Sequence, residues 1–301
     1  MKRLSRLISI ILAGVAVGCL LSAGILYLDG TKDDIQSEQL LDAFRTMAQE
    51  ESEQTQEDQA GSSDAATEPQ DTQESTAQTD SSSTVSDYTE STETTEEVPA
   101  VVNPYADSYL ANDDMVAWLK IPDTVIDYPV MWTPKDENYY LYRSFDKKEN
   151  KNGCLILDTD SSLKPLTTNL IIHGHNMKSG AMFGNLTDYE DKKYYEKHKQ
   201  IILYTPECQR NYEVIAVFRS QVYKKSDKVF KFYNFFQADT EEEFLDFYNN
   251  IKALSLYDTG VSASFGDHFI TLSTCVYHVT NGRFVVVAKE VESGDTYLPL
   301  E

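Results

Sequence analysis

The chain has 301 residues and a formal net charge of −23, from 49 acidic and 26 Lys or Arg side chains. Much of the excess lies between residues 31 and 100, which hold 19 acidic and 2 basic side chains. No stripe of basic residues is present in the sequence, which argues against nucleic acid as a partner.

Residues 1–30 predict a membrane anchor. Lys2, Arg3 and Arg6 precede an apolar run from Ile8 to Leu28, a length of about 21 residues that spans a bilayer. Basic residues before the span orient the amino terminus to the cytoplasm and the rest of the chain to the outside. A cleaved signal peptide is the alternative, although its apolar core is usually only about 7–15 residues long. We therefore expect a single-pass protein of the cell membrane with an extracellular domain.

Residues 31–100 are rich in Ser, Thr, Gln, Asp and Glu and contain few large apolar side chains. Such a composition cannot bury enough apolar surface to fold, so the sequence predicts a disordered, extended acidic stalk. At its start, the apolar spacing of Leu40, Leu41, Phe44 and Met47 predicts a short membrane-proximal helix.

Residues 101–301 have the length of one folded domain. Asn103 and Pro104 predict the start of a helix, and a second short helix is expected from Asp113. Short runs of β-branched and aromatic residues then predict strands over residues 125–130, 154–157, 169–173, 200–205, 212–218, 269–275 and 283–291. This pattern is typical of a mostly β barrel or sandwich.

One helix interrupts the strands. Thr240 and Glu243 have the spacing of a capping box, and Phe244, Phe247, Ile251 and Leu254 form an apolar stripe. The helix should pack as a lid or a flank before the strand that ends at Cys275.

That last strand and its successor suggest a reactive hairpin. Alternation puts Ser273 and Cys275 on one face, and Asn281-Gly282 predicts a turn before Arg283. If Cys275 and Arg283 are opposed, their Cβ atoms lie about 5 Å apart, with a guanidinium beside a thiol. A buried structural cysteine remains the alternative.

A reactive thiol also requires a base or a cationic neighbour. His175 and His173, where a strongly apolar strand gives way to a loop, are the first candidates, and His278 in the hairpin link is the next. His173 and His175 could instead bind a metal with Cys275. Cys154 and Cys208 could form a disulfide outside the cell, although reduced core residues are favoured.

Together these residues resemble the sortases, the Gram-positive cell-wall transpeptidases, and specifically class B. The resemblance is carried by Thr271-Leu-Ser-Thr-Cys275 with Arg283, by Asn169-Leu-Ile-Ile-His-Gly-His-Asn-Met177, and by Trp118-Leu-Lys-Ile-Pro122. It covers about residues 103–291 and is specific because Gly174-His175, the Thr271–Cys275 motif and Arg283 occur together in this chain order.

The resemblance implies an eight-stranded sortase β-barrel with N-terminal helices and one helix inserted before the cysteine strand. It implies that Cys275, His175 and Arg283 are catalytic and that Ser273, Asn138 and Leu141 contact substrate, with no metal and no cofactor. The expected substrates are surface proteins with a C-terminal NPxTN- or xPxTG-like sorting motif, cleaved after Thr. The expected acceptor is an amine of a peptidoglycan precursor or of a pilin.

Two other functions are compatible with the residues. A cysteine protease would use the same groups but release the acyl enzyme with water. A non-enzymatic adhesin displayed on an acidic stalk would not need Cys275, His175 and Arg283 to lie close together.

Overall fold

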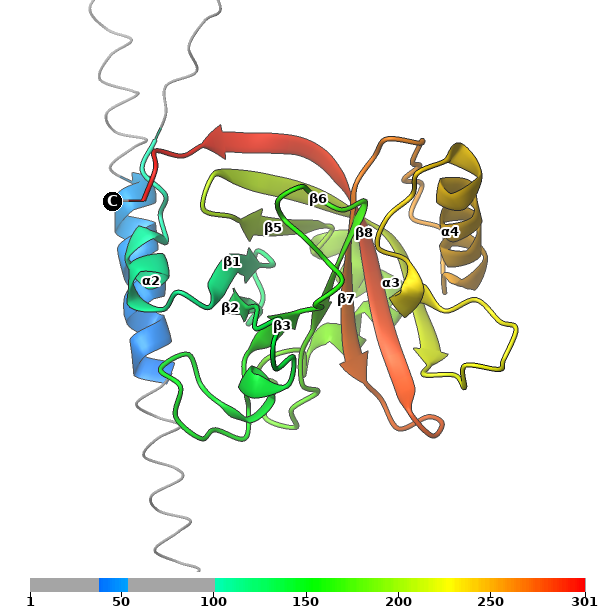
Figure 1. The fold of residues 1–301 in the computed structure, drawn as a ribbon, viewed down its shortest axis with the longest axis horizontal. Coiled ribbons are helices and arrows are strands. Elements are labelled where there is room, and N and C mark those ends of the chain that lie inside the picture. The colour runs from blue at the N-terminus through cyan, green and yellow to red at the C-terminus, as the bar shows by residue number, and fades with distance from the viewer. Residues whose placement is uncertain (1–37, 54–100, 301) are drawn as a thin grey trace, which may run out of the picture.

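The computed structural model describes residues 38–53 and 101–300, and its centre is a closed eight-stranded barrel (Figure 1). The strands are β1 (Met115–Lys120), β2 (Asp127–Met131), β3 (Leu155–Leu157), β4 (Asn169–His173), β5 (Gln200–Tyr204), β6 (Cys208–Gln221), β7 (Phe269–Cys275) and β8 (Gly282–Thr296). Their order around the barrel is β1-β2-β3-β4-β7-β8-β6-β5. The pairs β2/β3 and β4/β7 are parallel, and the others are antiparallel. The mostly β barrel expected from the sequence is confirmed.

Because side chains alternate along the strands, the buried residues form two cores, one inside the barrel and one on its outer surface. On β7, Ile270 and Leu272 point into the barrel, whereas Phe269 points outward. The outward residues of β6, β7 and β8 pack against α4 (Glu241–Leu254), which contributes Phe244, Phe247 and Ile251. Both cores are therefore needed to place β7 and β8, since each strand is covered on its two faces.

The capping box predicted for α4 is present. The Thr240 hydroxyl accepts from the Glu243 N–H, and the Glu243 carboxylate accepts from the Thr240 N–H. The helix lies against the outer surface of the barrel (Figure 1), so it is a flank and not a lid.

The second helix predicted from Asp113 is wrong, because β1 occupies that segment. The run from Met115 to Lys120 pairs with β2 on one side and β5 on the other, and Trp118 and Leu119 are fully buried. Short apolar runs fit a helix or a buried strand equally well, and here sheet pairing decides the outcome. The first helix exists as α2 (Ala106–Ala111), although Asn103 caps no helix and its side chain instead accepts from the Tyr105 N–H.

Short helical turns complete the domain. They are η1 (Tyr139–Tyr142), η2 (Leu186–Glu190), α3 (Lys192–Lys197) and η3 (Phe232–Asn234). The turn η1 precedes β3, and η3 lies in the long connection between β6 and β7.

Residues 38–53 form a helix packed on one end of the barrel beside α2 (Figure 1). Leu41, Phe44 and Ala48 are buried and belong to the main core. A short helix was expected here as the first part of the stalk, but its packing against the barrel was not expected, since residues 38–53 belong to the folded domain.

The predicted anchor over residues 1–30 and the remainder of the stalk lie outside the described residues. Within the described ranges, no helix is both long enough and apolar enough to cross a membrane.

Candidate active site

The hairpin of β7 and β8 places Cys275 directly opposite Arg283 in the antiparallel register. At the next rung the Val276 N–H donates to the Gly282 carbonyl at 3.0 Å. Hydrogen-bonded and non-hydrogen-bonded pairs alternate along such a ladder, so Cys275 and Arg283 form a non-hydrogen-bonded pair, in which side chains are closest. The predicted opposition of Cys275 and Arg283 is therefore present in the fold, and both residues line one cavity.

The Arg283 side chain is held at the start of β8 by its own turn. Its Nη1 donates to the backbone carbonyls of Gly282 at 3.1 Å and Asn281 at 3.4 Å. Asn281 has φ 57°, the left-handed conformation that Asn tolerates in tight turns. The Asn281-Gly282 turn that the sequence predicted therefore also restrains the Arg283 guanidinium.

His175 lies two residues beyond the end of β4, whose last residue, His173, pairs with Ser273 of β7. The His175 Nε2 is 2.8 Å from the Leu141 carbonyl oxygen, and its ring lies 5.4 Å from the Tyr142 ring. A carbonyl only accepts, so Nε2 carries a proton in this contact, and whenever the ring is neutral Nδ1 is the nitrogen with the lone pair. The turn η1 therefore fixes both the ring and its tautomer.

The six site residues that the family resemblance implies all line one cavity of about 640 Å³. They are Cys275, His175, Arg283, Ser273, Asn138 and Leu141. The Cys275 side chain is exposed to solvent, so the thiol is not the buried structural cysteine that the sequence left open. The expectation of an adhesin, that the three reactive residues lie apart, is not met.

Sequence reasoning missed part of the cavity wall. Phe232 and Tyr233 of η3, together with Val222, come from the connection between β6 and β7, and Tyr142 comes from η1. Nothing in the local pattern around η3 pointed to the site, because its position depends on the packing of that whole connection. Tyr142 could have been found from its position next to Leu141.

The two other histidines considered as the base, His173 and His278, have different surroundings. His173 Nε2 lies 3.0 Å from the Asp158 carboxylate, in a pair at the edge of the cavity. His278 is exposed in the link between β7 and β8. Among the described residues, no group of three or more His, Cys, Asp or Glu side chains is arranged to hold a metal ion.

Cys154 and Cys208 are free thiols rather than a disulfide. Burial raises the pKa of the Cys154 thiol well above its usual value, so this cysteine stays protonated in the core.

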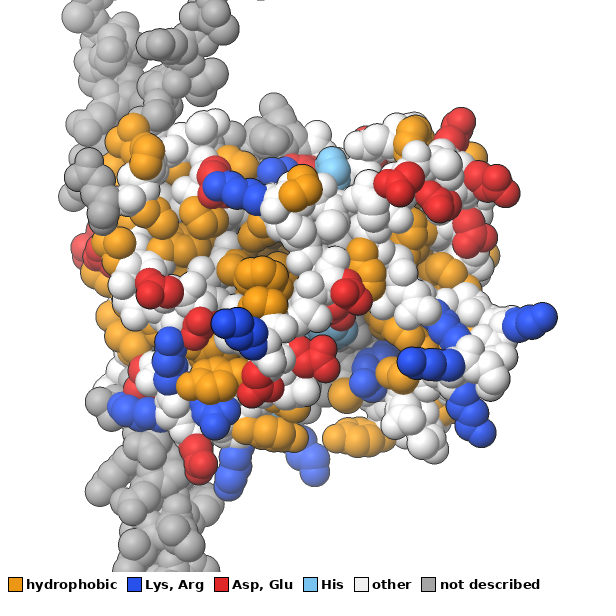
Figure 2. All heavy atoms as spheres, in the orientation of Figure 1, with side chains coloured by type: hydrophobic (Ala, Val, Ile, Leu, Met, Phe, Trp, Pro, Cys, Tyr) orange, Lys and Arg blue, Asp and Glu red, His pale blue; other side chains and the backbone are white. Residues whose placement is uncertain are grey.

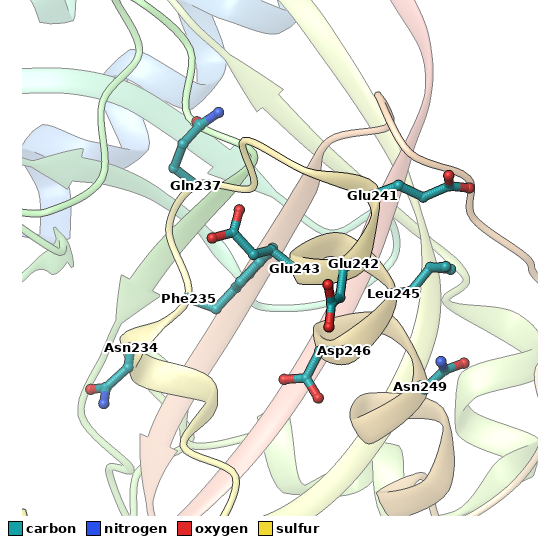
Figure 3. A pocket seen from close by; sticks show the side chains of 9 residues that line it. All are labelled: Asn234, Phe235, Gln237, Glu241, Glu242, Glu243, Leu245, Asp246 and Asn249. Carbon is teal, nitrogen blue, oxygen red and sulfur yellow. The ribbon is translucent and has the colours of Figure 1, made fainter.

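A second hollow, of about 890 Å³, lies over the first turns of α4 (Figure 3). Its lining includes the carboxylates of Glu241, Glu242, Glu243 and Asp246 (Figure 3). Acidic side chains gather over the region of α4, at the upper right of Figure 2. None of the six predicted residues lines this hollow, and it contains no nucleophile and no histidine among its described lining residues. The chemistry therefore belongs to the cavity around Cys275.

A family model described as "Sortase domain" matches residues 119–291. The chain belongs to the sortase family. Two curated relatives are named Sortase B. The one from Listeria monocytogenes is 33% identical over 186 residues, which cover 60% of this chain and 71% of the relative. The one from Staphylococcus aureus is 32% identical over 185 residues, which cover 60% and 72%.

Solved structures agree with the family. A Staphylococcus aureus sortase B–substrate complex matches with a TM-score of 0.56 and 29% identity, over 64% of this chain and 86% of that chain. A Clostridium perfringens sortase B matches with a TM-score of 0.55 and 26% identity, over 62% and 98%. The sortase described here is thus of class B, and its activity is that of a cysteine transpeptidase.

Proposed function

We propose that this sortase cleaves a C-terminal NPxTN- or xPxTG-like sorting motif after Thr and transfers the protein to a cell-wall amine. The observation that carries the proposal is the opposed pair Cys275 and Arg283, in one cavity with His175. A nucleophile, a proton carrier and a fixed cation around one open cavity are the groups that acyl transfer requires.

In the first half-reaction the Cys275 thiolate attacks the Thr carbonyl of the motif and forms a tetrahedral intermediate. The Arg283 guanidinium donates hydrogen bonds to the substrate carbonyl and its developing negative charge. Collapse of the intermediate expels the amine of the next residue, which takes its proton from the His175 imidazolium, and leaves a thioacyl enzyme.

In the second half-reaction an amine attacks the thioester. His175, now neutral, removes a proton from this amine, and Cys275 leaves as the thiolate. With Nε2–H bound to the Leu141 carbonyl, Nδ1 is the nitrogen available to take up and give back that proton. Leu141 thus has two roles, because its backbone carbonyl orients the His175 ring and the residue also lines the cavity.

Ser273 is proposed as a substrate contact. Its side chain is 2% exposed, and its hydroxyl has no hydrogen-bond partner among the described residues although it lines the cavity. A buried hydroxyl without a partner is unfavourable, and a bound peptide group would supply the missing bond. Asn138, exposed at the cavity edge before η1, is proposed as a second contact.

The comparisons support the partners by analogy. One matched structure is described as a substrate complex of Staphylococcus aureus sortase B. Another, with a TM-score of 0.57 and 28% identity, is described as Sortase B complexed with triglycine, a short peptide with a free amine. For this chain we infer a sorting-signal protein as donor and an amine of a peptidoglycan precursor or a pilin as acceptor.

We further propose that residues 1–30 anchor the enzyme in the cell membrane, with the amino terminus in the cytoplasm and the catalytic domain outside. Tethering donor and enzyme to one surface raises their effective concentrations. Protease added to intact cells should remove the catalytic domain, and protection of that domain would contradict the orientation.

The reaction is tested with residues 32–301 as a soluble protein, NPxTN- and xPxTG-type peptides, and triglycine. Mass spectrometry should show a peptide joined to triglycine through Thr, absent with Cys275→Ala and present with the matched control Cys208→Ala. A product formed only by hydrolysis, whatever the triglycine concentration, would favour the protease. Equal activity of Cys275→Ala would refute the proposed nucleophile.

A further inference from the structure

The parallel pairing of β4 with β7 ends just before the two residues that carry the chemistry. The last paired residues are His173 and Ser273, and one more backbone bond follows, from the Gly174 N–H to the Ser273 carbonyl at 3.2 Å. His175 and Cys275 both lie two positions beyond the last pair. Their separation therefore depends on what holds the chain after the ladder stops.

In a regular parallel ladder, the next two acceptors would be the carbonyls of Gly174 and Cys275, served by backbone N–H groups of the opposite strand. Both carbonyls instead receive side-chain donors. The Thr274 hydroxyl donates to the Gly174 carbonyl at 2.7 Å, and the Asn176 amide donates to the Cys275 carbonyl at 2.8 Å. Two side chains thus occupy the places of the next two rungs.

This substitution has a geometric consequence for His175. If the backbone hydrogen bonds continued, His175 would remain part of strand β4. A side chain bridges a longer distance than a backbone N–H does, so the backbone at His175 can diverge from β7 while the two segments stay connected. The His175 carbonyl is then fixed by the N–H of Phe183, a fully buried residue, at 3.0 Å. The ring is free to reach Leu141 and the cavity, while its backbone stays tied to the end of β7.

We propose that Asn176 and Thr274 are positioning residues, which hold the His175 segment in register with Cys275 through these two bonds. The inference rests on the proposed function, because it takes Cys275 as nucleophile and His175 as proton carrier. Neither side chain needs to touch the substrate. Misplacing a reacting group by about 1 Å lowers rates by about 100-fold, so loss of one rung should be visible in kcat.

Asn176 gives the cleaner test because its side-chain bond is solvent-exposed and its loss does not open the core. We expect Asn176→Ala and the isosteric Asn176→Asp, whose ionised carboxylate cannot donate, to lower kcat by about 10- to 100-fold, with KM changed by less than about threefold. Asn185→Ala is the matched control, because Asn185 lies in the same connection and its side chain donates to the exposed Asp188 carboxylate.

A second measurement separates positioning from damage to the nucleophile or the fold. Alkylation of Cys275 by iodoacetamide needs the thiolate alone, so its rate in both Asn176 variants should stay within about twofold of the parent enzyme. For Thr274, which is 2% exposed, Thr274→Ser keeps the donor and should retain activity, whereas Thr274→Val removes it and should lower kcat.

The outcomes distinguish this inference from the function on which it rests. An active Cys275→Ala enzyme would refute the proposed function. Inactive Cys275→Ala and His175→Ala enzymes, with Asn176→Ala and Asn176→Asp as active as Asn185→Ala, would leave that function standing and overturn the inference. An alkylation rate that falls in parallel with kcat would also overturn it, because the defect would then lie in the thiol.

Discussion

Arg45 donates from Nε and Nη2 to the backbone carbonyl of Asp127, at 2.9 and 2.7 Å, across 82 positions of sequence. The same guanidinium lies 5.0 Å from the centre of the Tyr128 ring. One residue earlier, Phe44 packs edge-on against Phe145 at 5.5 Å. These contacts fasten the helix over residues 38–53 to the barrel.

Removing the anchoring side chain of this helix should destabilise the whole domain. Phe44 is 7% exposed, and Phe44→Ala should lower the free energy of unfolding by about 3 kcal/mol, as large-to-small changes in a core do. The measurement is urea unfolding of residues 32–301. Gln49→Ala, on the exposed face of the same helix, is the matched control. Equal midpoints for both variants would mean that the helix is not docked in solution.

Docking of this helix changes the expected role of the acidic segment. Only about ten residues separate Leu28, at the end of the predicted span, from the helix, a distance of at most about 35 Å. Residues 54–100 then connect two parts of one folded unit rather than joining it to the membrane. Replacing residues 55–99 with a short Gly/Ser linker should therefore leave stability and activity close to those of the parent protein. A large loss of stability on deletion would contradict this.

Ser273→Ala should separate stability from substrate binding. The buried hydroxyl has no partner among the described residues, so its removal should leave the free energy of unfolding unchanged or raise it by up to about 1 kcal/mol. If the hydroxyl binds substrate, kcat/KM should fall by about tenfold. Unfolding curves and steady-state kinetics on the same preparations check both. If Ser273→Ala lowered the free energy of unfolding but left kcat/KM unchanged, the hydroxyl would stabilise the fold and would not bind substrate.

Arg283→Lys tests whether charge alone is sufficient beside Cys275. Lysine keeps the charge but lacks the planar fork that can bond the Gly282 carbonyl and a substrate oxygen together. We expect kcat to fall by about 100-fold, the size of effect seen on loss of one oxyanion donor, with little change in KM. Arg219→Lys, whose parent side chain pairs with Glu190 outside the cavity, is the control. A normal kcat for Arg283→Lys would mean that Arg283 contributes only its positive charge and not the hydrogen-bond geometry of its guanidinium.

The sequence predicted β4 and β7 to the residue, because both are apolar runs with clear turn signals at their ends. It offered Cys275 opposite Arg283 only on the condition that the two residues flank the turn, and the register of β7 with β8 meets that condition. Their common cavity with His175 was known only from the family resemblance. Parallel pairing of β4 with β7 brings His173 to Ser273 across 100 positions, and no local pattern encodes such a pairing.

Two errors have one physical origin. The segment from Met115 to Lys120 became β1, and the segment from residue 38 to 53 became part of the core, because partners distant in sequence were available to cover them. Local propensity and composition describe a segment in isolation. Leu41 and Phe44 lie in an acidic region, and the burial of Phe44 depends on Trp118 and Phe145, which that region does not contain.

Gly174, between the two histidines, should not tolerate a side chain. A Cβ there would lie 2.6 Å from Leu155 Cδ2 and 2.6 Å from Phe183 Cδ2, and both residues are fully buried. Gly174→Ala should therefore lower the free energy of unfolding by about 1–3 kcal/mol through overpacking. It should also reduce kcat, since Phe183 holds the His175 carbonyl. Gly260→Ala is the control, because a Cβ there meets nothing within 4 Å and only its φ of 78° is strained, at about 1 kcal/mol. If Gly174→Ala and Gly260→Ala had the same kcat, the packing beneath the histidine would not set the geometry of the site.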